Sequence, residues 1–191
     1  MEILAIVLIA LLYLALISYS VVAYVLQALS LQAVAKRRGI EKPFLAWIPI
    51  ANMWLLGCIS DQYQYLTRGV DRKYRSKLLW LMIATFIGLV PMYIVEFAML
   101  FASGAGAAAG TVTLLTVLTI VFALLVVVIA VVASLYQYVA IYDYFHSCQP
   151  DSAVWYLVLS MVVPFVYPVF VFTLRNKDLG LPAEPEQTSA E

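Results

Sequence analysis

The stretch TVTLLTVLTIVFALLVVVIAVVASLYQYVAIY, residues 111–142, is a run of 32 residues without a charged side chain. About 20 apolar helical residues are enough to cross a bilayer core of about 30 Å. We therefore expect a membrane helix that is longer than this core and that tilts or projects into the headgroups. The C-terminal end of the run is rich in tyrosine, which is typical of the aromatic belt at a membrane–water interface.

The composition of the whole chain indicates the same class of protein. Of its 191 residues, 65% are apolar and 12% are charged, whereas a soluble domain has about 45–50% apolar and about 25% charged residues. One soluble core could not hide so much apolar surface, so the sequence predicts an all-α integral membrane protein. The 11 basic and 11 acidic residues balance, which argues against a nucleic-acid partner, because binding to phosphates needs an excess of cations.

Long apolar runs predict about four transmembrane helices. They cover residues 3–34, 78–101, 111–145 and 154–174. Together they form a single predicted membrane domain, residues 1–182. The acidic, proline-containing tail at 183–191 has too little apolar surface to fold and is expected to be disordered.

Two apolar segments contain proline and are less regular than the others. Residues 44–60 are short for a span and include Pro49, so we expect an interfacial or re-entrant hairpin there. Residues 154–174 are long enough to cross, but Pro164 and Pro168 each remove a backbone donor and clash with the preceding turn. This segment is either a broken fourth helix or a second hairpin.

The basic residues predict the orientation. Nine of the 11 lie between the first and second spans, so by the positive-inside rule the loop at 35–77 is cytosolic in a multi-pass protein of the cell membrane. The N-terminus is then outside. Arg175 and Lys177 favour an inside C-terminus, whereas the uncharged run before them favours a crossing, so the side of the C-terminus stays open.

Two groups of residues in this loop are candidates for contact with the membrane. Five cations interleaved with tyrosines can contact anionic lipid headgroups. Each such cation contributes about 1 kcal/mol to membrane binding. They are Arg68, Arg72, Lys73, Arg75 and Lys77. We expect Trp47, Pro49 and Asn52 to form the structural hinge of the hairpin, because Pro49 lacks a backbone donor, Asn52 can bond to the freed carbonyls, and Trp47 can anchor the turn at the headgroups.

Few residues could carry chemistry. Glu96 is the only ionisable residue inside a span and is a candidate intramembrane polar site, but it lies near the outer end and no second charge is available for a relay. Asp143 and His146 share a helix face near Cys148, and such groups can form a nucleophile, although polar residues are also ordinary where a helix leaves the membrane. Two cysteines and one histidine predict no metal site and no cofactor.

Two stretches resemble a family of small uncharacterised polytopic membrane proteins from clostridial-type bacteria. The first contains AWIPI at 46–50 with Asn52, then Leu56-Gly57 and the run SDQYQ at 60–64, and the second is RNKDLG at 175–180. The close resemblance covers about a quarter of the chain. It implies the membrane fold and supplies no catalytic residue.

These observations predict a non-catalytic membrane protein that acts as a scaffold or accessory subunit of a larger membrane assembly. Its expected partners are the lipid bilayer, with anionic headgroups, and a membrane protein or a second copy of the chain. The alternative is a small transporter or channel component, with a path lined by the broken elements at Pro49 and at Pro164 and Pro168.

Overall fold

A computed structural model describes residues 2–104, 106 and 108–177 of the chain, so the tail expected at 183–191 lies outside the described residues. The described elements are all helical, which confirms the all-α prediction. In chain order they are α1 (Glu2–Arg37), η1 (Pro43–Trp47), α2 (Pro49–Arg68), α3 (Tyr74–Gly104), α4 (Ala109–Cys148), η2 (Pro150–Ser152), α5 (Ala153–Val162), η3 (Pro164–Val166) and α6 (Tyr167–Leu174).

Among the described residues, three helices and not four are long and apolar enough to cross a membrane. They are Ile6–Arg37 within α1, Tyr74–Gly104 and Ala109–Cys148. The expected fourth span, residues 154–174, is divided between α5, with 10 residues, and α6, with 8 residues. Neither reaches the length of about 20 residues that a crossing needs.

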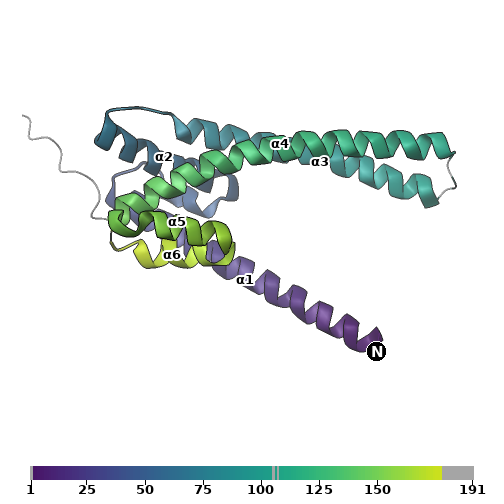
Figure 1. The fold of residues 1–191 in the computed structure, drawn as a ribbon, viewed down its shortest axis with the longest axis horizontal. Coiled ribbons are helices and arrows are strands. Elements are labelled where there is room, and N and C mark those ends of the chain that lie inside the picture. The colour runs from purple at the N-terminus through teal and green to yellow at the C-terminus, as the bar shows by residue number, and fades with distance from the viewer. Residues whose placement is uncertain (1, 105, 107, 178–191) are drawn as a thin grey trace, which may run out of the picture.

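The three long helices share a core at one end only (Figure 1). α3 and α4 pack along each other as an antiparallel pair, and α1 diverges from that pair. The buried core lies where α1, α2 and α4 meet, and includes Leu31, Leu55, Ile59, Tyr144 and Phe145. Side chains at 6–18 and 20–22, in the N-terminal part of α1 that we call the α1 arm, are exposed.

The hairpin expected over 44–60 is not formed. Residues 43–47 make one 3-10 turn, and a continuous helix, α2, starts at Pro49. Proline fits the first position of a helix, where its missing N–H has no intrahelical partner and its fixed φ is already helical. Ile48 before it is extended, with φ −101° and ψ 118°, as a residue preceding proline prefers. Pro49 therefore begins a helix and does not break one.

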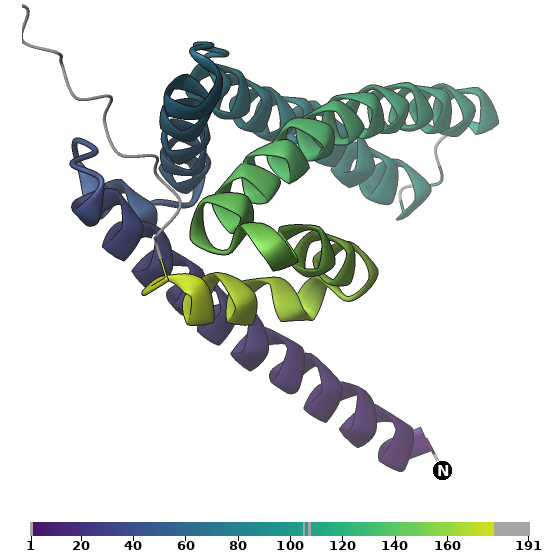
Figure 2. The ribbon, with the colours of Figure 1, turned by 60° about the vertical axis from the view of Figure 1, so that its left-hand side comes forward.

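The segment 154–174 is a helical hairpin, which decides between the two alternatives for it. Val163 leaves the helical region, with φ −127° and ψ 83°, because the following Pro164 disfavours helix at the residue before it. α5 runs away from the end of α4 and α6 returns alongside α1 (Figure 2). Pro168 lies in the first turn of α6, where a missing N–H is tolerated.

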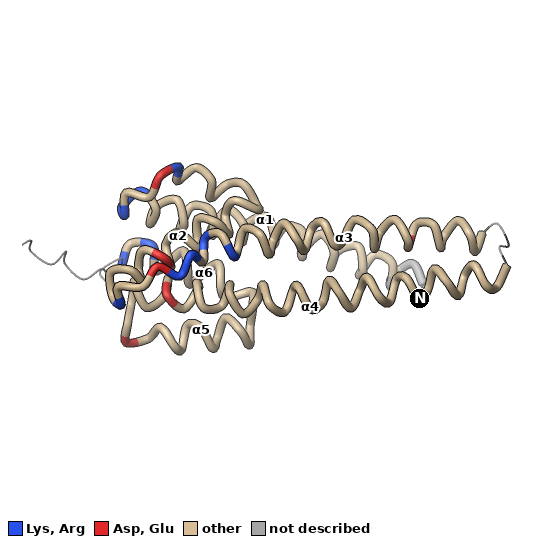
Figure 3. The backbone as a smooth tube through the Cα atoms, turned by 90° about the horizontal axis from the view of Figure 1, so that it is seen from above, with Lys and Arg blue, Asp and Glu red and all other residues tan. Residues whose placement is uncertain are grey.

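All lysines and arginines gather at one end of the molecule (Figure 3). We call this the charged end; it carries Arg37 of α1, Tyr74 of α3 and Cys148 of α4. α2 does not separate the two basic groups of the loop. The α5–α6 hairpin returns the chain to the same end, where Arg175 and Lys36 line one cavity and Lys177 Nζ donates to Gln149 Oε1 at 3.4 Å. The charged end coincides with the buried core, while the apolar helices project away from it.

Candidate functional site

The run SDQYQ, residues 60–64 of α2, organises the charged end. Five consecutive residues at about 100° each point around the whole circumference of a helix, so they face different neighbours. Each of the five side chains has a hydrogen-bond partner outside α2. α2 is therefore the element that joins α1, α3 and α4 at the core.

Asp143 of α4 is the buried acceptor for two of these side chains. The whole residue is 1% exposed. Ser60 Oγ donates to Oδ2 at 2.5 Å, and Gln64 Nε2 donates to Oδ1 at 2.7 Å. A buried carboxylate is stable only when such donors replace its hydration. Both oxygens are used to hold α2 against α4.

A second set of bonds ties α2 and α4 to the end of α1. Tyr63 Oη lies 2.6 Å from His146 Nδ1, and burial raises the pKa of Tyr63, so its hydroxyl is protonated at neutral pH. Arg38, 7% exposed, donates from Nη2 to Ser147 Oγ at 2.6 Å. Gln62 Nε2 donates to the carbonyl oxygen of Arg38 at 3.2 Å.

Asp61 caps α3 across the tertiary structure. Its carboxylate accepts the backbone N–H groups of Tyr74 at 2.7 Å and Arg75 at 3.1 Å, and it pairs with the Arg75 side chain at 3.9 Å. The first N–H groups of a helix have no intrahelical acceptor and favour an anion. Gly57, one turn earlier in α2, lets the two backbones approach: a Cβ there would lie 2.5 Å from the Cα of Arg75.

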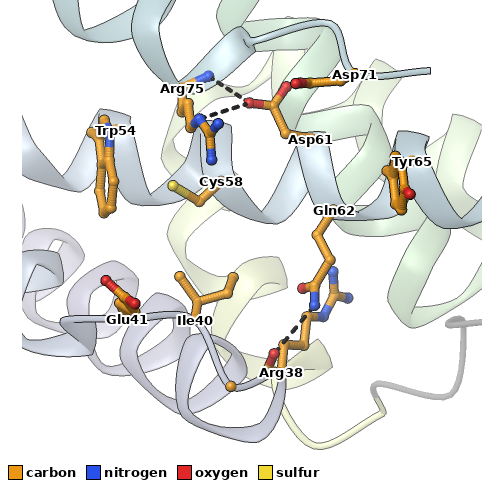
Figure 4. A pocket seen from close by; sticks show the side chains of 11 residues that line it. Arg38, Ile40, Glu41, Trp54, Cys58, Asp61, Gln62, Tyr65, Asp71 and Arg75 are labelled. Atoms are coloured by element: carbon orange, nitrogen blue, oxygen red, sulfur yellow. Dashed lines mark hydrogen bonds and ion pairs between the residues drawn. The ribbon is translucent and has the colours of Figure 1, made fainter. Parts of the chain in front are cut away.

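A cavity of about 460 Å³ opens beside α2 at the charged end. Its walls come from the loop 38–41, from α2 and from residues 71–75 (Figure 4). Ile40, Trp54 and Cys58 supply apolar surface, and Arg75 and Gln62 supply polar groups. Burial raises the pKa of the Cys58 thiol to about 12, so the thiol in this wall is protonated at neutral pH and is not an activated nucleophile.

Of the expected hinge residues, one starts α2 and the other two contact α1. Pro49 is at the start of α2, and Trp47 donates from its indole to Gln32 Oε1 of α1 at 3.1 Å. Asn52 is 2% exposed, and its Oδ1 accepts from Gln27 Nε2 of α1 at 3.4 Å. The side chains of Trp47 and Asn52 thus contact α1, and no side chain caps the start of α2.

The five candidate headgroup cations are all exposed at the charged end. Arg75 lines the cavity, Arg72 Nη1 donates to Tyr74 Oη at 3.3 Å, and the Lys77 ammonium lies 5.4 Å from the ring centres of Tyr74 and Tyr136. Glu96 is exposed on α3, far from this cluster in the chain. The structure brings Glu96 together with none of the other candidate residues that it describes.

Asp143 and His146, two of the three residues considered for a nucleophile, are engaged with α2. The carboxylate of Asp143 accepts from α2, Nδ1 of His146 lies against Tyr63, and Cys148 is buried. No group of three His, Cys, Asp or Glu side chains that could hold a metal ion occurs among the described residues. These polar residues connect helices.

Three residues that hydrogen-bond between α2, α4 and the end of α1 were not predicted from the sequence: Arg38, Ser60 and Gln64. Arg38 follows two other cations in the chain, so it could not be told apart from solvated charges, although it is buried. Ser60 and Gln64 had a detectable signal, because five polar residues in a row interrupt an otherwise apolar helix.

No protein-family model, curated protein or solved structure matches this chain. The resemblance to the clostridial membrane proteins therefore stays a prediction.

Proposed function

We propose that this chain is a multi-pass protein of the cell membrane that acts as a non-catalytic scaffold or accessory subunit of a larger membrane assembly. The observation that carries this proposal is the divergence of the apolar helices from a single shared core. The exposed α1 arm extends about four to five turns beyond the shared core. A membrane helix of this kind can pack against helices of another protein by van der Waals contact.

The orientation in this proposal has the charged end in the cytosol. All 11 basic residues lie there, and cytosolic loops are enriched in lysine and arginine. The N-terminus is then outside, residues 35–77 are cytosolic, and residues 175–177 return to the cytosolic side. The α5–α6 hairpin, which exposes Trp155, Val162 and Phe165, enters the cytosolic leaflet without crossing.

The hydrogen bonds of the buried polar groups support a non-catalytic role. Catalysis by side chains needs a nucleophile or base within reach of a substrate. Here the carboxylates of Asp61 and Asp143 are used to hold α3 and α2, and the thiol of Cys58 is protonated. The polar chemistry of the charged end is that of a rigid support.

Purification from native membranes tests this function. The tagged full-length chain should retain a stoichiometric membrane partner in mild detergent. Replacement of residues 6–17 by polyleucine keeps the length and hydrophobicity of the α1 arm but changes its shape, and it should release the partner. As a control, Val117, Val121 and Val128 on exposed α4 positions are changed to leucine, which should leave the partner bound.

Two results would contradict the proposal. The first is a chain that purifies alone after chemical cross-linking of intact membranes. The second is a partner that the polyleucine variant retains and the α4 control loses.

A transporter component is the second candidate, and one observation favours it. A cavity of about 140 Å³ lies between α4 and the hairpin, lined by Pro164 together with Ser134, Gln137, Ser160 and Tyr167. Broken helices that expose polar groups at membrane depth often line a substrate path. Solute flux through liposomes that contain only this chain would support the transporter and count against the accessory role.

A further inference from the structure

We propose that the cavity beside α2 binds a zwitterionic phosphoethanolamine headgroup, supplied by a phospholipid of the cytosolic leaflet. This inference rests on the membrane orientation given under the proposed function, and not on the existence of a protein partner. The volume of the cavity, about 460 Å³, falls within the range of about 300–1,000 Å³ that small-molecule sites occupy.

The cavity lies where headgroups meet acyl chains. The 3-10 turn η1 follows directly after the cavity loop 38–41, and it exposes Phe44 by 56% and Trp47 by 42%, with Ile48 beside them at 46%. Apolar and aromatic side chains exposed next to cations are typical of the interfacial layer. A lipid whose headgroup enters the cavity can therefore keep its acyl chains beside η1.

One end of the cavity suits a phosphate. The side chain of Arg75 is 51% exposed and pairs with Asp61 at 3.9 Å through Nε. A guanidinium has five N–H donors, so most of those of Arg75 remain for a ligand. Arginine is well suited to the phosphodiester oxygens, which it can bind in a bidentate manner.

The opposite side of the cavity suits an ammonium group. Glu41, an exposed carboxylate, and Trp54 lie on the same side of the view in Figure 4, away from Asp71. The carboxylate can pair with an ammonium, and the aromatic face of Trp54 attracts a cation. The whole lining holds two guanidinium groups, of Arg38 and Arg75, and three carboxylates, of Glu41, Asp61 and Asp71, so its mixed charge suits a zwitterion better than an anion.

Lipid retention by the delipidated full-length chain, measured by native mass spectrometry in detergent, tests the site. The probes are dioleoyl phosphatidylethanolamine, phosphatidylglycerol and phosphatidylcholine, with soluble glycerophosphoethanolamine as a fourth. Phosphatidylethanolamine should bind about tenfold more tightly than phosphatidylglycerol, since one charge-assisted hydrogen bond contributes about 1.5 kcal/mol or more. Phosphatidylcholine, whose ammonium has no N–H, should bind more weakly than phosphatidylethanolamine.

Variants separate the two ends of the site. Glu41→Gln should reduce the preference for phosphatidylethanolamine over phosphatidylglycerol, and Arg75→Gln should weaken both lipids about tenfold. Arg37→Gln, an exposed cation at the end of α1 that does not line the cavity, is the matched control and should change neither. Far-UV circular dichroism of each variant verifies that the helices are intact.

Three outcomes would overturn the proposal. Equal binding of phosphatidylethanolamine and phosphatidylglycerol, with equal losses in Arg37→Gln and Arg75→Gln, would show diffuse attraction to charge. Binding of glycerophosphoethanolamine as tight as that of the lipid would assign the site to a soluble metabolite. If the folded protein retains none of the probes, the cavity is not a headgroup-binding site. The partner pull-down is independent of all three, so the accessory role would stand or fall separately.

Discussion

At Gly57 the backbone of α2 closely approaches the start of α3. A Cβ at this position would meet the backbone of Arg75, with its N atom at 2.6 Å as well as its Cα. Backbone atoms cannot rotate away as a flexible side chain can, so the two helices would have to separate. Small residues at helix contacts permit this approach.

We therefore predict that Gly57→Ala destabilises the protein. Overpacking of a close contact costs about 1–3 kcal/mol, which outweighs the gain of about 0.5–1 kcal/mol from replacing glycine by alanine within a helix. The midpoint of thermal unfolding in detergent should fall. Gly104→Ala, where no atom lies within 4 Å of the new Cβ, is the control. An equal midpoint for wild type and Gly57→Ala would contradict the close contact.

Cys58 gives a prediction with a defined pH dependence. Burial raises the pKa of its thiol from 9.0 to about 12, and only the thiolate is alkylated. In a Cys148→Ala background, alkylation of Cys58 by iodoacetamide should be slow at pH 8 and should rise about tenfold per pH unit up to pH 11. Because the pKa is higher in the folded chain than in the unfolded one, ionisation of Cys58 lowers the free energy of unfolding. The full free energy of unfolding is present below pH 9, and the contribution of the neutral thiol is lost as the pH rises toward 12.

Mass spectrometry of the alkylated fraction checks this prediction. Ser76→Cys, exposed on the first turn of α3, provides the reference thiol in a chain without Cys58 and Cys148. Labelling of Cys58 at pH 8 as fast as that of the reference thiol would show that Cys58 is not buried and that its pKa is not raised.

At the scale of elements, α2 is held by bonds that it makes with distant parts of the chain. Ser60 and Gln64 bond to Asp143, which is 83 and 79 residues away, and Asp61 caps α3. These contacts explain how a helix with five consecutive polar residues can pack in an otherwise apolar core: each of the five side chains has at least one hydrogen-bond partner outside α2.

We predict that Asp143→Leu destabilises the α2–α4 contact far more than Asp143→Asn. Leucine leaves two buried donors, Ser60 and Gln64, without acceptors, at about 1–3 kcal/mol each. Asparagine keeps one acceptor oxygen, and the Ser60 hydroxyl can accept from its amide. Hydrogen exchange of the α2 backbone should rise strongly in the leucine variant and weakly in the asparagine variant. Similar exchange in both variants would show that the carboxylate does not hold α2.

The whole molecule predicts a specific pattern of accessibility. In a chain carrying Cys58→Ala and Cys148→Ala, single cysteines at Arg72 and Lys177 should react with a membrane-impermeant maleimide only after the cells are opened. A cysteine at Ala108, at the far end of the α3–α4 pair, should react in intact cells. Lys177 reports on the hairpin, because a crossing by residues 154–174 would place it on the same side as Ala108. Labelling of Lys177→Cys in intact cells would therefore contradict a re-entrant hairpin.

Much of this architecture can be predicted from local sequence alone. Apolar runs of more than 20 residues, with Glu96 as the one charged residue inside them, identify the three long helices, because such runs are stable in lipid whatever they pack against. The clustering of lysine and arginine between the first two spans identifies the charged end. Each of these cations prefers water to lipid whatever its neighbours in the fold are. The all-α class follows from these two patterns.

The rest depends on which surfaces meet. Proline at position 49 is compatible with a break or with a helix start, and only the packing of α2 against three neighbours selects the helix. Residues 154–174 are apolar enough to cross, but Val163 and Pro164 interrupt them, and contact of α6 with α1 returns the chain to the charged end. Similarly, Arg38, Ser60 and Gln64 became part of a buried cluster through partners far away in the chain. Hydrogen-bond partners separated by some 80 residues leave no local periodicity, so their pairing is a property of the folded molecule.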